Sequence, residues 1–185
     1  MREPEQARTW QRSEQQSQEK HSVRGSAPAN ASAPAEGNSR MPDIMHLVKI
    51  HASADQVYQA ITTAEGVRNW WTRDTALDSK VGGTGEFGFN GHQFIIKVKI
   101  DELTPQTHVG WKMISSGLPA FDGTTVAFDL RANGGDTMLA FAHRGFKRAD
   151  DGFAGATTRW GFYLVSLKRY LEGGQGSPNP IDADL

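Results

Sequence analysis

The chain has 185 residues, no cysteine and a formal net charge of -1. The lack of cysteine excludes disulfides, thiol nucleophiles and thiolate metal sites, and the balanced charge gives no indication of nucleic-acid binding. No apolar run approaches the roughly 20 residues of a membrane helix and no secretion signal is recognisable, so we expect a cytoplasmic protein without a membrane or nucleic-acid partner.

The first 40 residues have few large apolar side chains beyond Trp10 and are rich in Gln, Glu, Arg, Ala, Pro and Ser. Such a segment buries too little apolar surface to offset the entropy lost on ordering. The sequence therefore predicts a disordered tail over 1–40, the alternative being a docking peptide around Trp10. The expected domain spans 41–174, and a C-terminal tail follows over 175–185.

The start of the predicted domain combines a strand with a helical elbow. An apolar run over 44–51 predicts the strand. Ser53, with Gln56 three residues later, has the pattern of a capping box and predicts a helix start. Gly66 is expected to break this helix, and the apolar residues up to Trp71 predict a second short helical turn.

The middle of the chain has the period-two alternation of strands. A short strand is expected over 72–77, and Phe87 and Phe89 lead into Asn90-Gly91, the pair most typical of a two-residue hairpin turn. Alternating residues mark the strands that follow: Phe94, Ile96, Val98 and Ile100; Val109, Trp111 and Met113; Val126, Phe128 and Leu130; and Thr137 to His143. Consecutive strands joined by short turns predict an antiparallel meander.

The last part of the domain predicts a long amphipathic helix over 154–172. Thr157 and Thr158 are the candidates for its N-cap, and Gly173 is expected to end it. Its apolar stripe consists of Trp160, Tyr163, Leu164, Leu167 and Leu171. A single long helix must bury such a stripe against the sheet, so the predicted fold class is α+β.

Neither a cofactor nor a metal is expected from the short motifs. Gly83, Gly85 and Gly88 satisfy the G-x-G-x-x-G pattern, but a strand and a hairpin follow where a dinucleotide site needs a helix. We interpret these glycines as points where a strand bends at the edge of a curved sheet. The six histidines show neither an H-E-x-x-H pair nor clustering with carboxylates.

His143 shares a predicted strand face with Leu139 and Phe141, which points its imidazole into the apolar interior. Two interpretations are open. His143 is either a core residue with internal hydrogen bonds or a group that exchanges protons with a ligand near neutral pH.

The domain is rich in aromatic residues, which either form an ordinary core or line a ligand cavity between a curved sheet and the long helix. The candidate ligand-binding residues are Trp71, Phe89, Trp111, Phe128, Phe141, His143 and Trp160. Ala140 and Ala142 stand where polar residues would face solvent in their strand, so a partner or a second copy in a homodimer could cover that face.

The order of strand, helical elbow, antiparallel meander and long C-terminal helix resembles the helix-grip fold of the START-like or SRPBCC superfamily. Within it, residues 44–172 are similar to the C-terminal domain of the heat shock protein 90 ATPase activator. The residues that carry the resemblance are Val57 to Ile61, Trp70 and Trp71, Val81 to Gly83, Phe87 and Phe89, Thr137, Leu139, Phe141, His143 and Gly145, and Trp160, Leu164, Leu167 and Leu171.

The resemblance implies a curved antiparallel sheet of six or seven strands around the C-terminal helix, with a two-helix elbow after the first strand. It also implies a cavity for a lipid, a polyketide or an aromatic metabolite. Our first hypothesis is a binding module without catalysis, in which His143 orients a polar end of the ligand. The alternatives are a cyclase or dehydratase with His143 as acid or base, and a co-chaperone-like protein-interaction domain.

Overall fold

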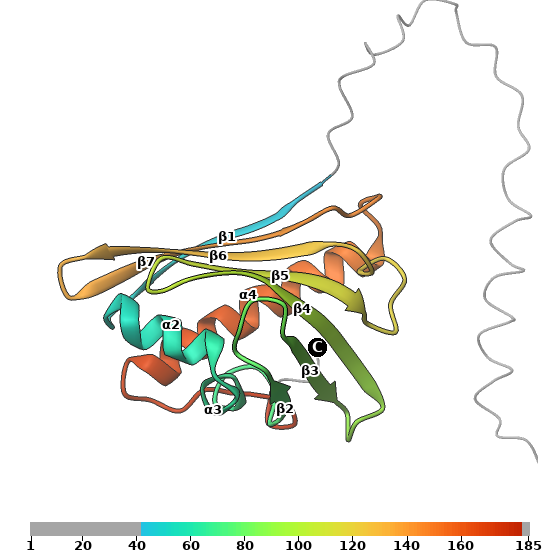
Figure 1. Ribbon diagram of the computed structural model, residues 1–185. Coiled ribbons are helices and arrows are strands. Elements are labelled where there is room, and N and C mark those ends of the chain that lie inside the picture. Colours follow the sequence, from blue (N-terminus) through green and yellow to red (C-terminus); the bar gives the residue numbers. More distant parts are fainter. Residues whose placement is uncertain (1–41, 183–185) are drawn as a thin grey trace, which may run out of the picture. The chain divides into compact units, whose positions relative to one another are not determined.

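The computed structural model describes residues 42–182 of the chain. The tail predicted over 1–40 and its Trp10 lie outside this range. The described residues form one seven-stranded antiparallel sheet with helices packed on its inner face (Figure 1). The strand order β1-β7-β6-β5-β4-β3-β2 is a meander to which the first strand has been added at one edge. The predicted α+β helix-grip architecture is therefore confirmed.

The bounds of the elements agree closely with the periodicity of the sequence. In chain order they are β1 (Ile44–Ile50), α2 (Ala54–Thr62), α3 (Ala64–Arg68), β2 (Asp74–Leu77), β3 (Thr84–Phe89), β4 (Phe94–Thr104), β5 (His108–Ser115), β6 (Thr125–Asn133), β7 (Asp136–Arg144) and α4 (Asp151–Leu171).

The elbow of α2 and α3 begins with the predicted capping box. The Ser53 side chain accepts a hydrogen bond from the backbone N–H of Gln56, whose side chain in turn accepts one from the Ser53 N–H. The break between the helices lies at Thr63, not at Gly66 as expected. Thr63 ends α2 and caps α3 through its hydroxyl oxygen, which accepts the N–H of Gly66 at 3.0 Å. Gly66 instead permits close packing, since a Cβ there would lie 2.6 Å from the Cα of Ala60.

The β3–β4 hairpin is confirmed, but its turn is longer than predicted. Phe89 pairs with Phe94, so the loop covers the four residues between them instead of Asn90 and Gly91 alone. Asn90, Gly91 and His92 all have positive φ angles, that of His92 being 71°, and His92 Nδ1 lies 2.6 Å from the Asp74 carboxylate. The sheet edge on this side is β2, so the glycine run lies one strand inward from the expected edge.

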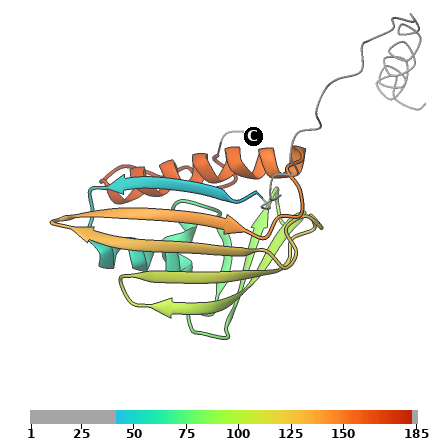
Figure 2. The ribbon, with the colours of Figure 1, turned by 90° about the horizontal axis from the view of Figure 1, so that it is seen from above.

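Helix α4 begins earlier than predicted, because Asp150 provides the N-cap. Its carboxylate accepts the backbone N–H of Phe153 at 3.1 Å. The expected caps Thr157 and Thr158 lie inside the helix, where their hydroxyls donate to backbone carbonyls one turn earlier. Gly173, with a φ of 88°, follows the helix end as expected. Figure 2 shows α4 running alongside β1.

The segment after α4 packs on the domain, which differs from the expectation that 175–185 is a tail. Asn179 forms a parallel bridge with Thr72. The N–H of Arg73 donates to the Asn179 carbonyl at 3.0 Å, and the Asn179 N–H donates to the carbonyl of Trp71 at 2.9 Å. Backbone pairing of this kind leaves no apolar pattern in the sequence, so the packing was missed.

Candidate functional site: a pocket beside helix α4

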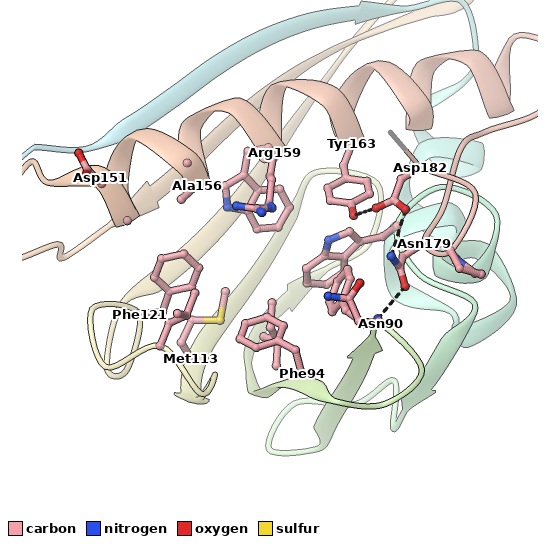
Figure 3. A pocket seen from close by; sticks show the side chains of 18 residues that line it. Asn90, Phe94, Met113, Phe121, Asp151, Ala156, Arg159, Tyr163, Asn179 and Asp182 are labelled. Carbon is pink, nitrogen blue, oxygen red and sulfur yellow. Dashed lines mark hydrogen bonds between the residues drawn. The ribbon is translucent and has the colours of Figure 1, made fainter. Parts of the chain in front are cut away.

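A pocket of about 630 Å³ lies between the β3–β5 part of the sheet and the first half of α4 (Figure 3). Five segments of the chain meet around it: the turn after α3, the hairpin β3–β4, strand β5 with its following loop, helix α4, and the C-terminal segment. The lining residues are Trp71, Phe89, Asn90, Phe94, Ile96, Met113, Leu118, Phe121, Asp151, Gly152, Gly155, Ala156, Arg159, Trp160, Tyr163, Asn179, Pro180 and Asp182.

One side of the pocket is a wall of carbon. The Phe89 ring lies 5.8 Å from Trp71 and 6.0 Å from Phe94, measured between ring centroids. Met113 and Phe121 continue this wall from β5 and the loop after it. Such a surface favours an apolar guest over water, since water finds no hydrogen-bond partners there.

The other end of the pocket is polar. The Tyr163 hydroxyl donates a hydrogen bond to the Asp182 carboxylate, and the Asn179 side-chain amide donates to the same carboxylate at 3.0 Å. The amide oxygen of Asn179 accepts the backbone N–H of Asn90 at 3.2 Å. Figure 3 shows Tyr163, Asp182, Asn179 and Asn90 at one end of the space, with Arg159 farther along α4 and Asp151 at the opposite end. The carboxylate is thus held from two sides.

Tyr163 stays neutral in this setting. Burial raises the pKa of its hydroxyl far above the usual value, and the hydrogen bond to the Asp182 carboxylate raises it further. The positive charge of Arg159 lowers the pKa of Tyr163, but this effect is the smallest of the causes. The phenol is therefore a hydrogen-bond donor with a fixed acceptor, not a base.

Three of the seven candidate binding residues line the pocket. They are Trp71, Phe89 and Trp160. Trp111, Phe128, Phe141 and His143 do not line it; all four are buried in the protein interior. A cavity is present beside α4, as the sequence suggested. Most of the side chains that line it are not the ones that the sequence analysis named.

The buried rings instead pack against each other. Ring centroids of Trp111 and Phe128 lie 5.0 Å apart, those of Phe128 and Phe141 5.3 Å, and those of Phe141 and Trp160 4.5 Å. These are the usual separations of tilted and edge-to-face aromatic pairs. The rings fill the space between sheet and helix, so this part has the ordinary core that the alternative interpretation predicted.

His143 belongs to an internal chain of hydrogen bonds. The indole N–H of Trp160 donates to His143 Nδ1 at 3.0 Å, and His143 Nε2 lies 2.8 Å from the hydroxyl oxygen of Thr124. Since Nδ1 accepts, the ring proton sits on Nε2 and is donated to Thr124, whose own hydroxyl donates to the carbonyl of Phe121. Both ring nitrogens are satisfied by the protein.

The surroundings of His143 also oppose protonation. Burial lowers its pKa from the usual 6.5 to about 3. A charged imidazole would in addition present an N–H to the indole N–H of Trp160. The structure therefore contradicts both roles expected for His143, that of orienting a ligand and that of general acid or base, and supports its interpretation as a core residue.

Several pocket residues were not among the sequence candidates. The alternation of the strands predicts that Phe94 and Met113 point inward, and the helix stripe predicts the same for Tyr163. Arg159 and Asp182 carried no comparable signal. Asp182 in particular reaches the pocket only because the C-terminal segment turns back.

Residues 42–182 contain neither a cluster of metal-binding side chains nor a helix that could span a membrane. Within this range no three His, Asp or Glu side chains are close enough together to hold a metal ion. None of the helices that the structure describes is long and apolar enough to span a membrane.

The outer face of the sheet carries a small apolar patch on β1 and β7. Met45 and Leu47 of β1 are 67% and 62% exposed. They pair in register with Ala142 and Ala140 of β7, and Met138, which pairs with Lys49, is the next residue of β7 on the same face. We call Met45, Leu47, Met138 and Ala140 the outer patch.

Comparisons with known proteins agree with this architecture. Residues 51–172 match the family model described as Activator of Hsp90 ATPase homolog 1-like protein. The chain is similar to the protein in "Solution structure of the Aha1 dimer from Colwellia psychrerythraea", with 35% sequence identity and a TM-score of 0.67, over 74% of this chain and 100% of that one. The comparison with curated proteins gives no match.

More distant structures share the fold alone. The protein SSP2350 from Staphylococcus saprophyticus has 15% identity and a TM-score of 0.63, over 76% of this chain and 99% of that one. CalU16 from Micromonospora echinospora has 18% identity and a TM-score of 0.58, over 71% of this chain and 76% of that one. The family match and the relative with 35% identity confirm the resemblance inferred from the sequence.

Proposed function

The chain belongs to the Activator of Hsp90 ATPase homolog 1-like family, and from that premise we propose that it binds a small hydrophobic molecule in the pocket beside α4. The ligand class is a lipid, a polyketide or an aromatic metabolite. The observation that carries the proposal is a cavity of about 630 Å³ with a carbon wall and, at one end, a hydrogen-bonded polar cluster of Tyr163, Asn179 and Asp182.

The dimensions and lining of the pocket support this function. Ligand sites in proteins commonly have volumes of about 300–1,000 Å³ and are mostly apolar, with a few polar groups that fix the orientation of the guest. A guest that buries about 200 Å² of apolar surface would gain roughly 5 kcal/mol before the costs of association. Because this gain rises with the apolar area that the guest buries, we expect molecules with two or three fused rings to bind more tightly than single rings.

The alternative of a cyclase or dehydratase requires an acid–base group in the pocket, and the expected group, His143, does not line it. His143 is outside the pocket and both of its nitrogens are occupied. The titratable residues that line the pocket are Asp151, Arg159, Tyr163 and Asp182. Tyr163 and Asp182 hydrogen-bond to each other, which fixes the orientation of the carboxylate at one end of the pocket. Binding without catalysis is therefore the function we propose.

A fluorescent probe tests the proposal. N-phenyl-1-naphthylamine, which is uncharged and brightens in apolar surroundings, should bind the full chain. Ala156→Phe places a ring in the pocket from the inner side of α4 and should weaken probe binding at least about tenfold. Ala76→Phe, on the exposed side of β2, is the matched control and should bind like the original protein. Equal binding by all three chains would contradict the proposed site.

We also propose that a second copy of the chain covers the outer patch. Two observations support this: the patch exposes Met45 and Leu47 side by side, and the relative with 35% identity is described as a dimer. Burying two large aliphatic side chains from each copy favours association by several kcal/mol before its entropic cost.

The mass of the full chain in solution, measured by light scattering after size-exclusion chromatography, tests this second proposal. We expect a dimer for the original protein and a monomer for Leu47→Lys. Val81→Lys changes an equally exposed residue away from the patch and should remain a dimer. If the original protein is a monomer, or if Leu47→Lys is still a dimer, the proposal that a second copy covers the outer patch is wrong.

A further inference from the structure

The polar end of the pocket is built largely by a segment that lies beyond the family match. The match ends at residue 172, whereas Asn179, Pro180 and Asp182 line the pocket. The family match therefore does not cover the three residues that the C-terminal segment contributes to this end.

The C-terminal segment is held firmly enough to form a wall. The N–H of Ser177 donates to the hydroxyl oxygen of Ser166 at 2.7 Å, and that hydroxyl donates to the carbonyl of Trp70 at 2.8 Å. Directly before the Ser177 anchor, the chain passes so close to Asn69 at the end of the elbow that only glycine fits at position 176. A Cβ there would lie 2.1 Å from the carbonyl oxygen of Asn69.

Asp182 has acceptor capacity left for a ligand. A carboxylate offers about four lone-pair positions. The structure occupies one on each oxygen, by the Asn179 amide at 3.0 Å and by the Tyr163 hydroxyl. The carboxylate is thus oriented by two donors and presents its remaining acceptor positions at the pocket wall.

The charges around the pocket favour one sign of ligand. Among residues 42–182, the titratable side chains of the lining are Asp151 and Asp182, which are acidic, Arg159, which is basic, and the neutral Tyr163, so their formal charges sum to -1. Carbon-lined walls lower the effective dielectric and strengthen these interactions relative to water. An anionic guest meets net repulsion, whereas a neutral or cationic donor meets an oriented acceptor.

We propose that the C-terminal segment makes this pocket selective by charge: it accepts neutral or cationic aromatic molecules that donate a hydrogen bond to Asp182, and it rejects aromatic carboxylates. This inference rests on the proposed binding function, and it narrows the ligand class to hydroxylated or amino-substituted ring systems. Fatty acids and other apolar carboxylates are excluded by the same repulsion.

Three naphthalenes of equal ring size test the charge selectivity. They are 2-naphthol, 2-naphthylmethylamine and 2-naphthoate, which are respectively neutral, cationic and anionic at neutral pH. Each competes with N-phenyl-1-naphthylamine on the full chain. We expect 2-naphthol and the amine to bind at least about tenfold more tightly than 2-naphthoate.

Matched variants assign the selectivity to Asp182. Asp182→Asn should strengthen 2-naphthoate binding and weaken binding of the amine, each about tenfold. Asp101→Asn, on the outer side of β4, should leave the order unchanged. Tyr163→Phe removes a hydrogen bond to Asp182 but no charge, so it should preserve the preference for the amine over 2-naphthoate even where it loosens the segment.

The outcomes separate this inference from the proposed function. Tight binding of 2-naphthoate to the original protein, or an unchanged order in Asp182→Asn, would overturn the charge selectivity while leaving the binding function in place. If neither the probe nor any naphthalene binds, the proposed function fails, and the selectivity fails with it.

Discussion

The space between the sheet and α4 has two parts that differ in what fills them. In one part Trp111, Phe128 and Phe141 pack ring against ring and leave no room for a guest. In the other, Phe94 and Met113 face Tyr163 across a pocket of about 630 Å³. Both parts are aromatic, so richness in rings does not by itself decide between a core and a cavity.

The difference follows from which elements reach each part. In the filled part the elbow supplies Trp70 as a third layer, whose ring lies 6.5 Å from that of Phe128. In the open part the β3–β4 hairpin bends away from the rest of the sheet (Figure 1). The pairing of β4 with β5 shifts register twice, at Lys97/Val98 and at Ile100/Glu102, and such bulges bend a strand. A cavity remains because the hairpin bends away and no helix fills the space between it and α4.

The largest expected effect lies in the filled part. Phe128→Ala removes a fully buried ring that contacts Trp70, Trp111 and Phe141, and it should lower the free energy of unfolding by about 3–5 kcal/mol. Chemical denaturation measures this loss. A loss below about 1 kcal/mol would mean that this part is not packed as described.

The next effect depends on pH through His143. Its pKa is about 3 in the folded protein and near 6.5 when unfolded, so the unfolded chain takes up the proton first as pH falls. Its contribution to stability is complete above pH 6.5 and is lost between there and about pH 3, by up to about 1.4 kcal/mol per pH unit.

Denaturation of His143→Gln across the same pH range provides the comparison. Protonation of carboxylates with a lowered pKa, such as Asp136, destabilises both chains in acid, so only the difference between the chains is diagnostic. The original protein should lose stability more steeply than the variant between pH 6.5 and pH 4. Parallel curves would contradict a buried, neutral His143.

A smaller effect should link the C-terminal segment to the open part. Gly176→Ala forces the segment away from the carbonyl of Asn69 and should cost about 1–3 kcal/mol of stability. It should also weaken binding of N-phenyl-1-naphthylamine several-fold, because the segment forms a wall of the pocket. Gly135→Ala, which adds a Cβ in open space, is the control, and equal behaviour of the two variants would argue against an anchored segment.

The smallest expected loss of stability is in the open part itself. Phe94 is only partly buried, so Phe94→Ala should cost about 1 kcal/mol, well below the loss in Phe128→Ala. Probe binding should nevertheless fall several-fold, because the ring forms part of the carbon wall. Stability by denaturation and affinity by fluorescence titration together check this separation. Similar losses of stability in the two variants would erase the distinction between the two parts.

The sequence predicted the architecture well because its signals are local. The capping box at Ser53, the alternation in β4 and the stripe of α4 each follow from side-chain spacing, and all three were confirmed. The errors at element ends are also local. Thr63 and Asp150 provide caps that competed with better-known signals, and His92 lengthened a turn that Asn90 and Gly91 suggested.

The site was predicted less well because it depends on long-range geometry. Alternation places Phe128 and Phe89 on the inner face equally, but it does not say that a helix covers one and leaves space beside the other. The position of Asp182 is even harder to predict. Asp182 reaches the pocket because the backbone of Asn179 pairs with that of Thr72, which lies shortly before β2. His143 had an apolar face and a titratable ring, yet its bond to Trp160 is visible only in three dimensions.

The central claim is that a small aromatic molecule occupies the pocket beside α4, and the methionine methyl groups test it most directly. Met113 lines the pocket, whereas Met45 lies on the outer patch. In NMR spectra of the chain with ¹³C-labelled methionine methyls, titration with 2-naphthol should shift the Met113 signal and give contacts between its methyl and the ring protons, while Met45 stays fixed. A Met113 signal that does not move at saturating ligand, or a response at Met45 in its place, would contradict the account.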